Sequence, residues 1–148
     1  MFPYVEKSLH LLRPWSRCFG NRVDNVDKDQ RNDILRLLSY AENTMATIHT
    51  HRREFDLADK YCKLALSYAR RYEGEEELKS TLMYDALRTY CELRRFQGNH
   101  RDGVPYAEEA YNVVAMAYDP VHPKVQTAAA NLIECLIHTR NLFDAVYI

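Results

Sequence analysis

Glycine, proline and long apolar runs are all scarce in this chain of 148 residues. It contains 4 Gly and 5 Pro, and because a β-sandwich or barrel needs many turns, this composition disfavours both folds. No Gly-rich phosphate-binding loop is present, which argues against a nucleotide-binding α/β fold. No apolar run reaches the length of about 18 residues that a transmembrane helix requires. Together these absences favour a helical protein that does not span a membrane.

The chain also lacks an excess of charge of either sign. Its 20 Lys and Arg residues nearly balance 21 Asp and Glu residues, and the formal net charge of -1 does not point to nucleic acid. The N-terminal segment carries Glu6, Lys7 and Arg13 where a secretory signal peptide would be apolar. Glu6 and Pro3 also argue against a mitochondrial presequence. We therefore expect a cytoplasmic protein.

Sequence motifs that carry catalysis or metal binding are missing as well. The four cysteines, Cys18, Cys62, Cys91 and Cys135, form no CxxC pair, so their spacing is poor for a structural zinc site. We expect them to be reduced thiols that pack as small hydrophobic side chains. No HExxH or GxSxG motif occurs, and no Ser/His/Asp or Cys/His arrangement is identifiable. The sequence therefore predicts no enzyme activity, no cofactor and no metal site.

The chain does carry an apolar pattern with a period of about 3.6 residues from residue 30 onward. This pattern predicts an all-α fold with helices at 31–51, 55–73, 75–95, 103–118 and 124–140. No segment alternates between apolar and polar residues with a period of two, so no strands are predicted.

Several residues are candidates for ending or starting these helices. Gly74 can serve as a left-handed C-cap of the second helix, and Gly98 can stop the third. Asp102 is a candidate N-cap of the fourth helix. His122 lies in a turn bounded by two prolines, where a capping or packing role is favoured over catalysis. Asn141 is expected to end the fifth helix.

An internal repeat organises these helices into hairpins. Ala110 aligns with Ala65 at an offset of 45 residues, and the same offset places Gly103 on Ala58. A third, incomplete copy follows at an offset of 42 residues, from Gly103 to Ala145. A single hairpin cannot bury its apolar face, so the copies are expected to stack. The predicted division is a lead or capping segment over 1–26 and then repeats over 27–148, at about 31–74, 75–118 and 122–148.

The aligned segments resemble tetratricopeptide repeats. REFDLADKYCKLALSYA and RDGVPYAEEAYNVVAMA are similar to the second helices of such repeats, and NLFDA to the entry of a third. The period exceeds the norm of about 34 residues. With the DPVHP link at 119–123 followed by VQTAAANLIECL, the chain is most similar to the kinesin-light-chain type. The resemblance covers about residues 33–148 and implies a right-handed α-solenoid of helix-turn-helix hairpins.

The resemblance also implies a function, because the first helices of tetratricopeptide hairpins line a concave groove that binds peptides. It predicts a non-catalytic scaffold for a protein or peptide partner, with neither nucleic acid nor a membrane as a partner. The alternative is a structural solenoid segment of a larger assembly without a peptide ligand of its own. The candidate groove residues are Tyr40, Asn43, Thr47, Thr50, Asp85, Arg88, Glu92, Arg95, Thr127, Asn131, Glu134 and His138.

The last residues predict an apolar edge. Positions 142–148 begin a sixth helical pattern, in which Phe143, Val146 and Tyr147 would lack a partner. Solenoids end in polar caps, so we expect either a fragment or truncated product of a longer repeat protein, or self-association through this edge.

Overall fold

A computed structural model describes residues 27–139, and this part of the chain consists of helices and short connections without a strand. The all-α prediction is therefore confirmed for these residues. The five helices are α2 (Lys28–His51), α3 (Phe55–Arg71), α4 (Glu76–Phe96), α5 (His100–Ala117) and α6 (Pro123–His138). None of them is both long and apolar enough to cross a membrane. The predicted segment over 1–26, the helix end at Asn141 and the apolar edge over 142–148 lie outside the described residues.

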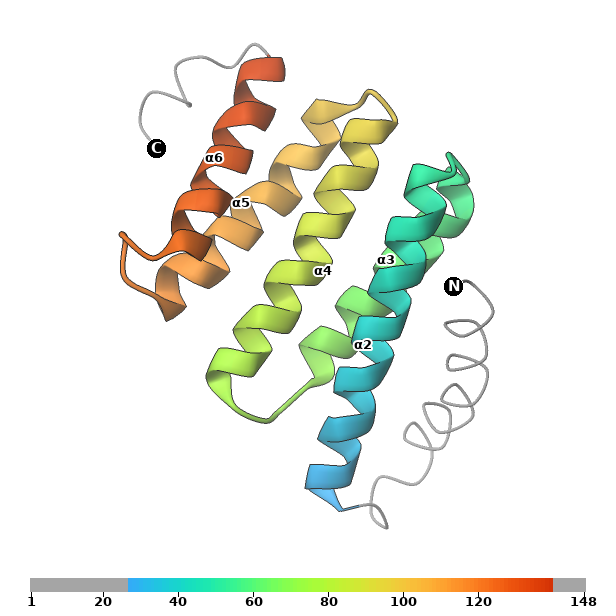
Figure 1. Cartoon of the computed structure of the whole chain (residues 1–148), viewed down its shortest axis with the longest axis vertical. Helices are drawn as coiled ribbons and strands as arrows, with labels where there is room; N and C mark the ends of the chain where they lie inside the picture. Colours follow the sequence, from blue (N-terminus) through green and yellow to red (C-terminus); the bar gives the residue numbers. More distant parts are fainter. Residues whose placement is uncertain (1–26, 140–148) are drawn as a thin grey trace.

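The helices pack mainly against their neighbours in sequence. α2 pairs with α3, α4 pairs with α5, and α6 packs against α5. α4 also contacts both α2 and α3, so this helix joins the two hairpins. In Figure 1, α3 and α5 lie behind α2, α4 and α6. Within the described residues the backbones of α4 and α6 both pack on α5 without coming close to one another.

Small side chains lie where the helices cross. Ala46, Ala58 and Ala65 are all 0% exposed and belong to one hydrophobic cluster with Leu87 and Ala110. Small residues in such places let two helix backbones approach closely and pack densely. The positions paired by the 45-residue alignment, Ala58 with Gly103 and Ala65 with Ala110, are all buried, as the repeat predicts.

The two hairpin turns have the same backbone geometry at a spacing of 45 residues. Arg53 after α2 and Gly98 after α4 both adopt the left-handed conformation, with φ values of 60° and 74°. In each turn this residue and the next one donate N–H bonds to helix carbonyls, as in a Schellman motif. The pairs are Arg53 to Thr50 at 3.1 Å, Glu54 to His49, Gly98 to Arg95 and Asn99 to Arg94, the last three at 2.9 Å.

Replacing Arg53 by glycine should stabilise the protein. A side chain in the left-handed conformation costs about 1–2 kcal/mol, and glycine removes this cost. Glycine also has more conformational freedom in the unfolded chain, which cancels about half of the gain in stability. Arg53 is exposed and forms no ion pair within the described residues, so its loss removes no such contact. We expect Arg53→Gly to raise the free energy of unfolding by about 0.5–1 kcal/mol and Gly98→Ala to lower it by about 1 kcal/mol, measured by urea denaturation.

Lys60→Gly is the matched control for this pair, because Lys60 is an exposed residue in the middle of α3. Glycine at a position with helical backbone angles costs about 1 kcal/mol. If Arg53→Gly destabilises the chain as much as Lys60→Gly does, the strain assigned to the first turn is refuted.

Two predicted helix ends are wrong. The N-cap of α5 is Asn99, whose Oδ1 accepts a bond from the Asp102 backbone N–H at 3.3 Å. Asp102 lies in the first turn instead, where its carboxylate accepts a bond from Asn99 Nδ2 at 2.6 Å. Gly74 does not adopt the left-handed conformation, because α3 ends at the extended residue Tyr72. The Tyr72 ring lies so close to Gly74 that any larger side chain there would collide with it.

The capping role predicted for His122 is confirmed. His122 is the N-cap of α6, and its Nδ1 accepts a bond from the Lys124 backbone N–H at 3.2 Å. Pro123 follows at the first helical position, where its missing N–H leaves no helix bond unmade. The His122 ring also stacks on Tyr118, with 4.1 Å between centroids, and this contact stabilises the same turn. This turn fixes where α6 starts along α5.

Candidate functional site

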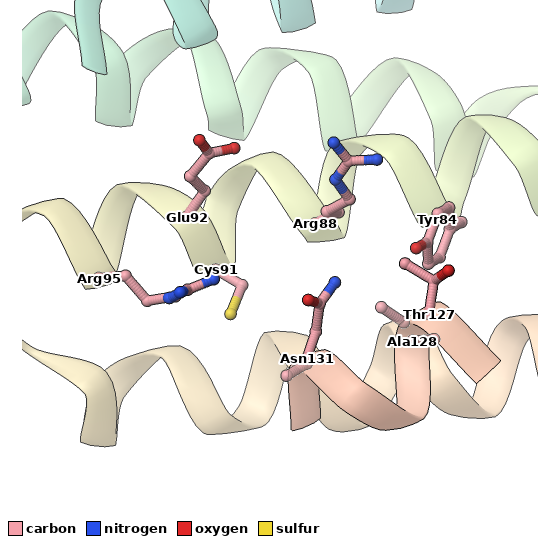
Figure 2. Close-up of a pocket in the computed structure, with 10 residues that line it drawn as sticks. Tyr84, Arg88, Cys91, Glu92, Arg95, Thr127, Ala128 and Asn131 are labelled. Carbon is pink, nitrogen blue, oxygen red and sulfur yellow. The ribbon is translucent and has the colours of Figure 1, made fainter. Parts of the chain in front are cut away.

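A pocket of about 280 Å³ lies between α4 and α6, with α5 as its floor (Figure 2). Ala107 and Ala110 of α5 and Ala128 of α6 contribute its small apolar surfaces. The pocket exists because α4 and α6 both pack on α5 while their backbones remain apart, and alanine side chains are too short to fill the space.

Polar side chains surround this apolar floor. Figure 2 shows Asn131 extending from α6 towards α4, and the Cys91 sulfur pointing from α4 into the space between the helices. Arg88 and Glu92 extend from α4 on the side away from α6 and form the rim. The Asn131 amide can both donate and accept hydrogen bonds, which suits a peptide backbone.

The two arginines of the pocket differ in how their charge is balanced. Arg95 donates to Glu134 Oε1 at 2.6 Å, an ion pair that ties α4 to α6. Arg88 is exposed and makes no ion pair within the described residues. Asp85 lies nearby on α4; burial raises the pKa of its carboxyl group, and the charges of Arg88 and Lys124 oppose this rise. Arg88 therefore offers a cation that has no direct ion-pair partner in residues 27–139.

The pocket brings together residues that the repeat alignment had placed in separate copies. Arg88, Glu92 and Arg95 come from the second copy, and Thr127 and Asn131 come from the third. Two other predicted residues of α6 lie beside the pocket rather than in it. They are Glu134, which holds Arg95, and His138, whose ring stacks on His100 with 4.3 Å between centroids.

The predicted groove residues of α2 do not line this pocket. Thr50 is 1% exposed and donates its hydroxyl to the Ala46 carbonyl at 2.7 Å, so it cannot meet a ligand, contrary to the prediction. Thr47 donates to the Asn43 carbonyl at 3.0 Å, and Tyr40 is 41% exposed. The Asn43 Oδ1 atom is buried without a hydrogen-bond partner in the described part of the chain.

A polar cluster around Asp59 was not predicted. The Asp59 carboxylate of α3 accepts bonds from Tyr90 Oη at 2.9 Å and Arg94 Nη2 at 3.0 Å, both from α4, and pairs with Lys63 at 2.8 Å. Burial raises the pKa of Asp59, but the hydrogen bonds from Lys63 and Tyr90 and the charges of Lys63 and Arg94 outweigh burial and hold this pKa below its ordinary value. The spacing of Asp59 and Lys63 was the only visible signal, since the partners on α4 depend on how the helices align.

A contact between two thiols was not predicted from the sequence either. Cys91 of α4 and Cys135 of α6 lie with their sulfur atoms 3.4 Å apart, although 44 residues separate them in sequence. Cys62 is also buried, and burial raises the pKa of its thiol to about 12. The prediction that cysteines pack as small apolar side chains is confirmed for these three residues.

No family model, curated protein or solved structure matches the chain. In the part of the chain that the structure describes, no group of three or more His, Cys, Asp or Glu side chains is placed to hold a metal ion.

Proposed function

We propose that this chain is a tetratricopeptide-type interaction scaffold that binds a peptide segment of a partner protein between α4 and α6. The proposal includes the stacking of the hairpins into a right-handed solenoid of the kinesin-light-chain type. It is supported by the helical hairpins, by the two turns of equal geometry 45 residues apart, and by the position of α2, α4 and α6 on one side in Figure 1. It is a binding role without catalysis.

The pocket between α4 and α6 is the observation that carries this proposal. Its volume of about 280 Å³ is at the lower limit for small-molecule sites, which start at about 300 Å³, and it suits one or two side chains of a peptide. The alanines of the floor favour an apolar side chain. Arg88 at the rim, which forms no ion pair with the described residues, favours a carboxylate close to it. The best ligand is therefore a segment that carries an acidic residue beside an apolar one.

The alternative is a structural segment of a larger assembly. It is favoured by exposed apolar side chains that do not line the pocket, above all Met116 at 91% and Val121 at 78% exposure. Exposed apolar groups of this kind are what an assembly contact would cover.

Selection from a phage-displayed library of random peptides against the whole chain tests the proposal. We expect the selected peptides to share an acidic residue next to an apolar one. Arg88→Ala should weaken their binding about tenfold or more, because a hydrogen bond to a charged group contributes about 1.5–3 kcal/mol. Asn131→Ala should weaken binding as well.

Arg101→Ala is the matched control, because Arg101 is an exposed arginine of α5 that does not line the pocket. It should leave the dissociation constants unchanged. A selection that enriches no peptide, or peptides whose binding ignores both Arg88→Ala and Asn131→Ala, would favour the structural alternative.

A further inference from the structure

The thiol pair beneath the pocket links two helices whose backbones do not approach each other. Cys91 Sγ and Cys135 Sγ are 3.4 Å apart and share a hydrogen bond, in which either sulfur can be the donor. A disulfide bond is about 2.05 Å long and joins cysteines whose Cα atoms lie about 4.4–6.8 Å apart. No Cα atom of α4 lies within 8 Å of a Cα atom of α6, so the bond would require the two helices to approach each other by more than about 1 Å, into the space of the pocket. The third described cysteine, Cys62, lies in a different hydrophobic cluster from this pair.

Access to this pair runs through the pocket. Cys135 is 0% exposed, whereas Cys91 is 5% exposed and lines the pocket, where Figure 2 shows its sulfur facing the open space. A molecule as small as a peroxide can therefore meet Cys91 while Cys135 stays behind it. Cys62, at 0% exposure, does not line the pocket.

The surroundings also favour an anion on the pair. The hydrogen bond from Cys91 lowers the pKa of Cys135 to about 7; burial opposes this change, and the charge of Arg95 adds to it. The pKa of Cys91 is raised correspondingly, because its proton is held by the hydrogen bond to Cys135. The anion therefore lies on Cys135, which can accept the proton of Cys91 when Cys91 reacts on the accessible side.

We propose that Cys91 and Cys135 form a dithiol site that hydrogen peroxide oxidises to an intramolecular disulfide between α4 and α6. The Cys91 sulfur attacks one peroxide oxygen while its proton passes to the ionised Cys135; an S–O bond forms, the O–O bond breaks, and the leaving hydroxide takes up a proton to become water. Cys135 then attacks the Cys91 sulfur; the S–S bond forms, the S–O bond breaks, and a second water leaves. In balance, two thiols and one peroxide give one disulfide and two waters.

The bond would covalently join α4 to α6 and hold them closer together than they are in the reduced protein, which would narrow the pocket. It would also close a long loop of the unfolded chain, since 44 residues separate the two cysteines. This proposal does not depend on a peptide ligand, and it holds or fails independently of the proposed binding function.

Peptide mapping of the whole, folded chain after treatment with a small molar excess of hydrogen peroxide tests this site. Remaining thiols are alkylated in denaturant, and the digest is analysed by mass spectrometry without reduction. We expect a cross-linked peptide pair containing Cys91 and Cys135, the loss of two hydrogens from the intact mass, and alkylated Cys62. Dithiothreitol should restore the original mass and make both cysteines alkylatable again.

Two variants and a denatured sample serve as controls. Cys135→Ser should abolish the cross-link, whereas Cys18→Ser should leave it intact. Protein treated in guanidinium should give mixed pairings, because the native fold no longer selects one pair. The proposal is overturned if peroxide leaves both cysteines alkylatable, drives Cys91 to sulfinic acid, or joins either cysteine mainly to Cys18. The mapping of the unsubstituted chain decides the matter even if Cys135→Ser does not fold.

Discussion

Leu87→Ala will lower the free energy of unfolding by about 2–5 kcal/mol, as truncation of a buried leucine does. Leu87 is 0% exposed and lies in α4, the helix that contacts α2, α3 and α5. The cluster around it includes small residues from each of these helices, such as Ala46, Cys62 and Ala110. Short side chains cannot move far enough to fill the cavity, so we expect the upper half of this range.

Urea denaturation followed by far-ultraviolet circular dichroism measures this loss. Met116→Ala is the control, since Met116 is 91% exposed and its truncation should change stability by less than about 0.5 kcal/mol. The dependence on urea concentration should stay constant if both hairpins unfold together through α4. A loss no larger than that of Met116→Ala would contradict the central role of Leu87, and a shallower urea dependence would mean that the hairpins unfold separately.

The apolar period of the sequence was sufficient to find the helices, because it reports which face of each helix is buried. It could not settle their ends, which depend on single hydrogen bonds. Asn99 and Asp102 are both good caps in sequence, but the left-handed Gly98 ends α4 so tightly that α5 starts directly after Asn99. Gly74 suited a left-handed C-cap equally well, yet the Tyr72 ring packs over it instead.

Several of the groove candidates from the repeat alignment line the pocket. A position on the face of one helix recurs at the same offset on the equivalent helix of the next repeat. On this basis Arg88 and Arg95, which line the pocket, were among the predicted groove residues. The alignment failed at Thr50, which occupies the position of Arg95 in the first copy. The Arg95 side chain extends far enough to be 32% exposed, whereas the short side chain of Thr50 remains buried between helices.

Contacts between helices of different hairpins could not be predicted from the sequence. The repeat alignment compares equivalent positions and predicts no contacts, so it did not indicate that Cys91 touches Cys135. Which residue meets which depends on how far α6 is shifted along α5, and the turn around His122 sets that shift through its cap and its stacking on Tyr118. The bonds from α4 to Asp59 depend on the same kind of alignment between α3 and α4.

The Asp59 cluster should have the largest effect among the polar contacts. Its carboxylate is 23% exposed and accepts hydrogen bonds from two residues of α4, Tyr90 and Arg94. Hydrogen bonds to charged groups contribute about 1.5–3 kcal/mol, and removing the charge leaves a half-buried arginine without its ion pair. We expect Asp59→Asn to lower the free energy of unfolding by about 2 kcal/mol at neutral pH. Glu108→Gln, the same change at an exposed position of α5, should cost less than about 0.5 kcal/mol.

The pH dependence of the stability difference between the unsubstituted protein and Asp59→Asn shows whether the charge of the carboxylate causes it. Because the pKa of Asp59 in the folded protein lies below its ordinary value of 3.8, the carboxylate contributes its full stabilisation above that pH. The contribution is lost as the pH falls through the lower pKa of the folded state. Urea denaturation at a series of pH values should therefore show the unsubstituted protein and Asp59→Asn converging in acid. A constant difference down to the most acidic folded sample would mean that the amide acts through packing and not through charge.

Combining Asp59→Asn with Tyr90→Phe separates the hydrogen bond from the rest of the cluster. Tyr90 also stacks on Tyr106, with 4.1 Å between centroids, and phenylalanine keeps that contact while it removes the hydroxyl donor. If the Tyr90 hydroxyl stabilises the fold through Asp59, the two losses should fall short of additivity by about 1 kcal/mol. Strict additivity would show that the tyrosine hydroxyl and the carboxylate act independently, and that Asp59 links α3 to α4 through Arg94 and not through Tyr90.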